Sequence, residues 1–263
     1  MRRLKRLLVG FFVLLGCFSI PGFALQDIAQ EAEQAYQKGE QASTIAERKV
    51  AFNQALTLYT QLESQSESVY STGKLYFNMG NTYYQLAEYS WAIVYYYRAL
   101  QLMPTSQKVR YNLNMALSKV SASPAEEMSI FQDALFFHFY LSLPERLQWL
   151  SYLALLMIIF GSLYLWYGWW GYKYMIIVLA VVWGLLFASV LYSRYVEPIN
   201  AIVVTPTALY RDAGVQYAKV IEKPILSGRK VQVIEVVDDG KWLKVLSTDG
   251  NVGYVPNTAV KII

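Results

Sequence analysis

Two long stretches without a charged side chain constrain this sequence more than any other feature. Residues 147–172 and 174–193 contain no Asp, Glu, Lys or Arg, and Lys173 alone separates them. A helix needs about 20 apolar residues to cross the roughly 30 Å of hydrocarbon in a bilayer. We therefore predict two transmembrane helices, over residues 147–167 and 174–193, that form a hairpin with a tight connection at residues 168–173. Trp and Tyr side chains at that connection are typical of a membrane interface.

The overall composition agrees with a membrane protein. Hydrophobic residues make up 55% of the chain, charged residues 16%, and the mean hydropathy is +0.26. The formal charge of +4 equals the contribution of Arg2, Arg3, Lys5 and Arg6, so no basic patch remains that could neutralise phosphates and a nucleic-acid partner is not expected. With one Cys, one His and no residue cluster around them, we predict no metal site, no cofactor and no enzymatic activity.

The first 24 residues have the pattern of an export signal. Basic residues precede an apolar stretch over residues 7–20, Pro21-Gly22 interrupts it, and small residues stand at Gly22 and Ala24. We predict a signal peptide over residues 1–24 that is cleaved after Ala24. A lipoprotein signal that places a lipid on Cys17, and an uncleaved anchor, remain as alternatives. All three place the chain from residue 25 onward outside the cytoplasm.

Residues 25–122 have a helical period, and a 34-residue unit stands out at residues 73–106. Small and aromatic residues fall where two packed helices need them, at Tyr76, Met79, Gly80, Tyr83, Ala92, Tyr96, Ala99 and Pro104. This pattern strongly resembles a tetratricopeptide repeat, in which the proline ends the second helix.

The repeat has imperfect neighbours on both sides. Ala55, Tyr59 and Leu62 match the second helix of a degenerate earlier repeat in which residues 41–50 are an insertion, and residues 107–119 match the first helix of a following one. Since one repeat cannot bury its own apolar face, we expect these neighbours to cap it. A capping box at residues 123–126 then predicts an amphipathic connecting helix over residues 123–145, which lies either on the bilayer surface or inside the repeat array.

From residue 199 to residue 263 the pattern changes to short alternating runs. Turn signals at residues 238–240 and 249–251 separate these runs, which predicts a small all-β barrel. The runs at residues 208–211, 226–228, 231–234, 241–245 and 253–256 resemble a bacterial SH3-like (SH3b) domain.

The predicted fold is thus a multidomain membrane protein with an all-α tetratricopeptide-repeat solenoid, a two-helix transmembrane hairpin and a C-terminal all-β SH3-like barrel. That order of parts resembles BatE-type proteins of the Bat (aerotolerance) operons. The resemblance implies a non-enzymatic scaffold in the bacterial inner membrane, with both domains on the extracytoplasmic side. It also implies partners, namely von Willebrand A-domain membrane proteins and a MoxR-type ATPase. The alternative is a module that binds peptidoglycan through the SH3-like domain.

Three asparagines are the candidate partner-binding residues of the repeats. Asn78, Asn81 and Asn112 fall on or near the face that binds extended peptides in such repeats, and an amide can both donate to and accept from a peptide backbone. The spacing of Asn81 and Asn112 resembles the paired asparagines of carboxylate-clamp repeats, although Phe77 stands where the clamp lysine is expected. The alternative is that these amides are ordinary helix-surface groups.

In the predicted barrel, Tyr210, Trp242, Tyr254 and Pro256 resemble the aromatic groove of SH3 domains. We interpret them as partner-binding residues, with Trp242 as a core residue in the alternative.

Catalytic patterns fail on inspection. Residues 71–74 and 227–230 match a serine-x-x-lysine pattern, but no accompanying motif follows either of them. His138 lies among Phe136, Phe137 and Phe139 without a nearby carboxylate or thiol, so we interpret it as a lone interfacial histidine.

Overall fold

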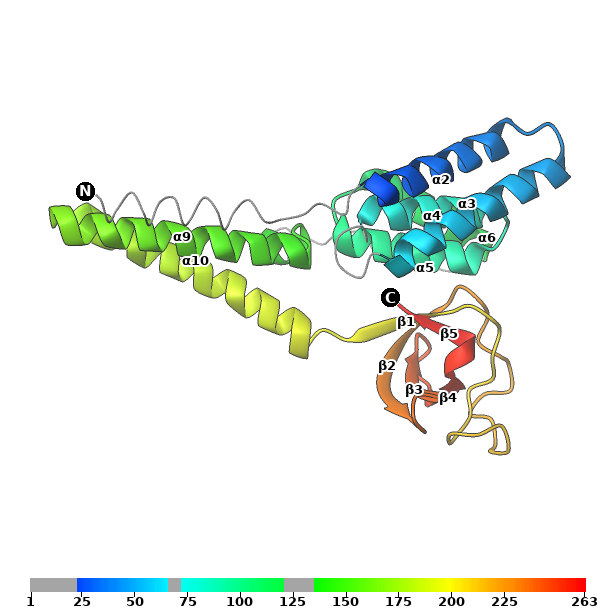
Figure 1. Ribbon diagram of the computed structural model, residues 1–263. Coiled ribbons are helices and arrows are strands. Elements are labelled where there is room, and N and C mark those ends of the chain that lie inside the picture. Colours follow the sequence, from blue (N-terminus) through cyan, green and yellow to red (C-terminus); the bar gives the residue numbers. More distant parts are fainter. Residues whose placement is uncertain (1–22, 66–71, 121–134) are drawn as a thin grey trace. The chain divides into compact units, whose positions relative to one another are not determined.

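A computed structural model describes residues 23–65, 72–120 and 135–263 of the chain (Figure 1). Residues 1–22 of the predicted signal peptide, with Cys17, and residues 123–134 of the predicted connecting helix lie outside the described residues, whereas Phe23 and Ala24 begin α2. The chain divides into two compact units, Met1–Ser68 and Val69–Ile263, and each is described by itself.

The first unit is an antiparallel pair of helices, α2 (Phe23–Gln41) and α3 (Ile45–Gln65) (Figure 1). The two helices pack closely around the Phe52 ring of α3. Gly39 of α2 leaves room for this ring, because a Cβ atom at Gly39 would lie 2.8 Å from it. The buried side chains of the pair are Ala32, Ala35, Ala51, Phe52, Ala55, Tyr59 and Leu62. The residues predicted as an insertion, 41–50, form the end of α2, a short turn and the first residues of α3, which begins at Ile45.

Three helices at the start of the second unit form the repeat region: α4 (Gly73–Gln85), α5 (Tyr89–Leu102) and α6 (Gln107–Lys119). The side chains of Thr72 and Ser106 cap α4 and α6 by accepting hydrogen bonds from the backbone N–H groups of Leu75 and Val109. Helix α5 packs against both α4 and α6. Its buried residues Ala92, Tyr96 and Ala99 lie in their shared core, as the repeat pattern predicts.

Helices α9 (Leu143–Tyr167) and α10 (Trp170–Tyr195) lie side by side as an antiparallel hairpin (Figure 1). Both are long and apolar enough to cross a membrane, and most of their side chains are exposed. The connection is shorter than predicted, because Gly168 ends α9 in a left-handed conformation (φ 63°) and α10 starts two residues later. Lys173 therefore lies in the first turn of α10 and not in the connection.

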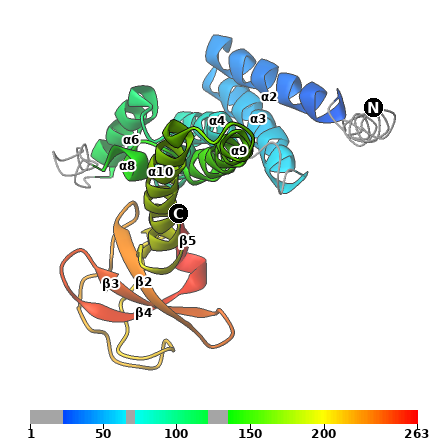
Figure 2. The same cartoon turned by 90° about the vertical axis from the view of Figure 1, so that its left-hand side faces the viewer.

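The C-terminal part is a five-stranded antiparallel sheet of strongly curved strands (Figure 2). Its strands are β1 (Ile199–Val203), β2 (Lys230–Val237), β3 (Trp242–Ser247), β4 (Val252–Pro256) and β5 (Val260–Ile262). The order is β4-β3-β2-β1-β5, so β4 and β5 are the two edges and the sheet is open. The antiparallel all-β prediction is confirmed, whereas the closed barrel is not.

The two faces of β1 serve two different cores. Val203 packs in the core of the sheet, whereas its neighbour Ile202, which is fully buried, packs in the core of the repeat helices. This division follows from the alternation of side chains along a strand. The contact continues at β5, where the Arg98 guanidinium of α5 donates a hydrogen bond to the Ile262 carbonyl oxygen at 3.2 Å and Lys261 Nζ lies 5.9 Å from the centre of the Trp91 ring.

Candidate functional site

The repeat helices bring two of the three predicted asparagines together. Asn81 lies on α4 and Asn112 on α6, and the Asn112 Nδ2 donates a hydrogen bond to the Asn81 Oδ1 at 2.8 Å. The Tyr96 hydroxyl of α5 donates to the same oxygen at 2.9 Å. One carboxamide oxygen therefore links the three helices of the repeat region.

This arrangement decides what the pair can offer to a ligand. Both hydrogen bonds use the oxygen of Asn81, so its Nδ2 group keeps two N–H donors, and Asn112 keeps its own Oδ1 as an acceptor. A peptide bond presents one acceptor and one donor. The pair is therefore chemically suited to an extended peptide backbone, which remains a proposal for these residues. Asn78 lies one turn earlier on α4, is half-buried, and is not part of this pair.

A cation that the sequence pattern did not single out lies near Phe77, one turn before Asn81 on α4. Phe77 occupies the place of the expected lysine, but Lys108 Nζ of the next helix lies 5.2 Å from the centre of the Phe77 ring. Lys108 is exposed and precedes Asn112 by one turn of α6. In the sequence, the signal for this lysine is its position one helical turn before Asn112.

The C-terminal part brings all four predicted aromatic-groove residues together. The Tyr210 and Trp242 rings meet edge to face, with 5.7 Å between their centres. Tyr210 and Tyr254 exchange two backbone hydrogen bonds, of 2.9 and 2.8 Å. Pro256 ends β4 opposite Trp242 in the register of the sheet. Trp242 is half-buried, so it is not part of the buried core.

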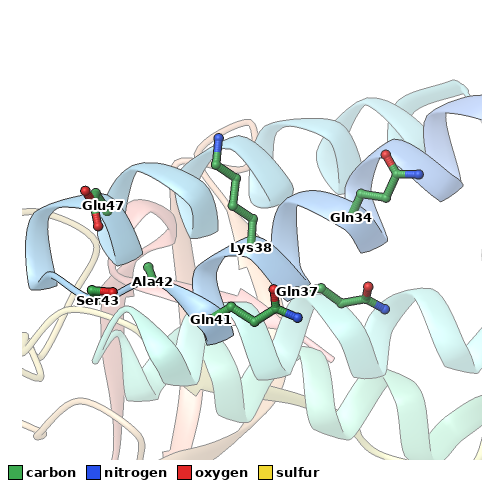
Figure 3. A pocket seen from close by; sticks show the side chains of 7 residues that line it. All are labelled: Gln34, Gln37, Lys38, Gln41, Ala42, Ser43 and Glu47. Carbon is green, nitrogen blue, oxygen red and sulfur yellow. The ribbon is translucent and has the colours of Figure 1, made fainter.

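The described residues also line two hollows. The larger, of about 590 Å³, follows the end of α2 and the turn to α3, and its lining is polar apart from one alanine (Figure 3): Gln34, Gln37, Lys38, Gln41, Ala42, Ser43 and Glu47. Glu47 is already engaged there, because its carboxylate accepts a hydrogen bond from the Thr44 N–H at the start of α3. The smaller hollow, of about 230 Å³, lies in the sheet between residues 221–231 and 247–249, where Arg229 and Asp249 contribute to its wall.

A polar cluster at the open end of the hairpin has no counterpart in the sequence analysis. Arg146 of α9 is only 6% exposed, and its Nη1 donates to the Ser189 Oγ at 2.8 Å and to the Ser193 Oγ at 3.0 Å, both on α10. His138 of the short helix α8 (Phe136–Phe139) places its Nδ1 3.1 Å from the same Arg146 nitrogen and 2.9 Å from the Ser189 Oγ. His138 is therefore not a lone histidine.

Ligands for a metal ion are not grouped in the described residues. Across residues 23–65, 72–120 and 135–263, no three His, Cys, Asp or Glu side chains lie close enough together to hold an ion.

Comparison with known proteins identifies the repeat itself. A family model described as "Tetratricopeptide repeat" matches residues 73–106, which are the limits predicted from the sequence. A search of the curated proteins gives no match. The chain thus contains a tetratricopeptide repeat, a motif that typically mediates protein–protein interaction rather than catalysis.

Proposed function

We propose that this protein is a non-enzymatic scaffold that is held in a membrane by α9 and α10 and binds protein partners through its repeat helices. The observation that carries the proposal is the Asn81–Asn112 pair, because its remaining N–H donors and its remaining oxygen acceptor match a peptide backbone. Asn81 lies inside the matched tetratricopeptide repeat, and Asn112 lies in the helix that follows it. Lys108 adds a positive charge beside the pair, which favours a segment with an acidic residue or a terminal carboxylate.

The specific assembly that we propose follows from the resemblance to BatE-type proteins. Its partners would be von Willebrand A-domain membrane proteins and a MoxR-type ATPase, and the repeat and sheet parts would lie on the extracytoplasmic side of the inner membrane. The shared core of α5, α6 and β1 supports one element of this topology, because it requires the two ends of the hairpin to emerge on the same face of the membrane.

Crosslinking and affinity purification from the native membrane test the proposal. The full chain should retain the von Willebrand A-domain proteins and the ATPase, and the combined substitution of Asn81, Asn112 and Lys108 by alanine should release them. Gln101→Ala is the matched control, since Gln101 is an exposed polar residue on α5, outside the pair. Partners that stay bound to the triple variant while its helices remain folded would refute the groove assignment. Loss of binding in the control as well would point to unfolding.

The aromatic cluster of the sheet supports a second candidate function, the binding of peptidoglycan by an SH3-like domain. Tyr210, Trp242 and Tyr254 form a half-exposed aromatic surface, and Lys244 Nζ lies 5.8 Å from the centre of the Tyr254 ring. Such a surface can stack on sugar rings. Sedimentation of the full chain with purified sacculi tests this, and Trp242→Ala should reduce the bound fraction. The full chain is needed because Ile202 of β1 belongs to the helical core.

A further inference from the structure

The polar cluster at the open end of the hairpin joins three elements through neutral acceptors. The Arg146 Nη1 donates to the Ser189 Oγ, the Ser193 Oγ and, at 3.3 Å, the Ser189 carbonyl oxygen. Arg146 Nε is buried and has no hydrogen-bond partner in the described part of the chain. A guanidinium that is this buried is normally paired with a carboxylate. Here the hydrogen-bonding groups that the described residues place at the Arg146 Nη1 are hydroxyls, a carbonyl and an imidazole.

The contacts favour a neutral His138 ring. An arginine nitrogen can only donate, so an unprotonated His138 Nδ1 can act as an acceptor at the 3.1 Å contact with Arg146, whereas a protonated ring cannot. The same Nδ1 also lies 2.9 Å from the Ser189 Oγ. A protonated ring would place an N–H group 3.1 Å from the N–H groups of a cation, and the contact would become repulsive.

We propose that His138, Arg146 and Ser189 form a pH-sensitive joint: the neutral ring fastens α8 to the α9–α10 hairpin, and protonation of the ring under mildly acidic conditions releases α8. Helix α8 precedes the hairpin in the chain, so the joint governs how α8 is held against α9 and α10. This role is independent of which partner the repeats bind.

The charged and titratable groups around the ring favour release at low pH. Burial and the nearby Arg146 lower the pKa of His138, and the carboxylate of Glu197, which follows α10, opposes them more weakly. Tyr192 of α10 meets the ring edge to face, with 5.3 Å between the ring centres. Because the pKa is lower in the docked state than in the released state, docking is fully favourable above the ordinary histidine pKa of about 6.5 and weakens as the pH falls below it.

The composition of the chain makes this proposal unusually easy to test. His138 is the only histidine in the sequence, so a full chain made with labelled histidine and without a polyhistidine tag gives one imidazole signal by NMR. In nanodiscs of zwitterionic lipid, that signal should titrate at a lower pH than it does in the denatured chain. Arg146→Met should move the titration back toward the denatured value. A wild-type titration equal to that of the denatured chain would overturn the proposal.

A second measurement follows the release itself. In a Cys17→Ser background, a spin label at the exposed position 136 of α8 should become more mobile between pH 7.5 and pH 5. His138→Asn is the matched control, because its Oδ1 can replace the Nδ1 acceptor but does not titrate; its label should stay immobile over the same range. A label whose mobility rises equally in both proteins, or in neither, would show that the ring is a fixed structural contact and would refute the joint.

Discussion

Gly80 shows at the scale of a single residue how the repeat is specified. A Cβ atom at this position would lie 2.6 Å from two atoms of the Tyr96 ring, and that ring is only 1% exposed and cannot move aside. Tyr96 in turn holds the Asn81 oxygen through its hydroxyl. The small residue, the buried ring and the candidate binding amide therefore depend on one another.

We expect Gly80→Ala to destabilise the repeat by about 1–2 kcal/mol, because an overpacked core loses more than the roughly 1 kcal/mol that alanine gains in helix propensity. Hydrogen exchange of the α4 and α5 amides measures the effect. Gly161→Ala is the control, since nothing lies within 4 Å of a Cβ atom at Gly161. Unchanged exchange in the Gly80 variant would contradict the packing argument.

At the scale of elements, the start of α9 is fixed by a capping box. The Ser142 Oγ accepts from the Glu145 N–H at 3.4 Å, and the Ser142 N–H donates to the Glu145 carboxylate at 2.7 Å. This cap precedes Arg146 directly, so it also sets where the guanidinium enters the hairpin.

Ser142→Ala should cost about 1 kcal/mol of helix stability, the usual loss for an N-cap side chain. Faster amide exchange in the first turn of α9 is the expected readout. Ser151→Ala in the same helix should leave that turn unchanged, because Ser151 is exposed and its hydroxyl only donates back to the Leu147 carbonyl oxygen. Equal exchange rates in the two variants would mean that the capping box does not stabilise this turn.

Elements with a strong local pattern could be predicted from the sequence, and the contacts between them could not. Residues 73–106 carry the repeat period, and the turn at Asp238, Asp239 and Gly240 has the positive φ angles that its residue types favour. By contrast, His138 stands among aromatic residues in the sequence, and its partner Ser189 comes from a helix 51 residues later. Likewise, no local pattern marks which face of β1 meets the repeat helices. The sequence did not predict that β4 and β5 remain unpaired edges, because an alternating pattern indicates strands but does not show whether a sheet closes into a barrel.

At the scale of the whole molecule, the β1 strand joins the sheet to the repeat helices. Ile202→Ala should destabilise α5 and α6 by about 2–5 kcal/mol although the substitution lies in a strand, because it leaves a cavity in the helical core. Hydrogen exchange of the two helices measures this. Val203→Ala, one residue further along the same strand, should affect only the sheet, since Val203 packs in the other core. Equal effects of both substitutions on α5 would refute the division of β1 between two cores.

Thiol labelling tests the proposed topology of the hairpin. In a Cys17→Ser background, a membrane-impermeant thiol reagent should label Asp249→Cys in intact spheroplasts and should label Lys173→Cys only after permeabilisation. The contrast is expected because the proposed topology places the sheet outside the cytoplasm and the connection between α9 and α10 inside it. Labelling of both positions from one side would show that α9 and α10 do not cross the bilayer as a pair.

The placement of Ile202 also has a consequence for biosynthesis. The repeat helices leave the ribosome long before β1 is made, and their core stays incomplete until α9, α10 and the strand have followed. A contact so distant in the sequence forms late and slows folding. Nascent chains must therefore keep the apolar surface around Ile93 shielded from aggregation while α9 and α10 are synthesised, so the repeat helices are expected to bind chaperones during that interval. A chain truncated before β1 should therefore show its defect in the repeat helices α4, α5 and α6, which would be synthesised intact and then degraded.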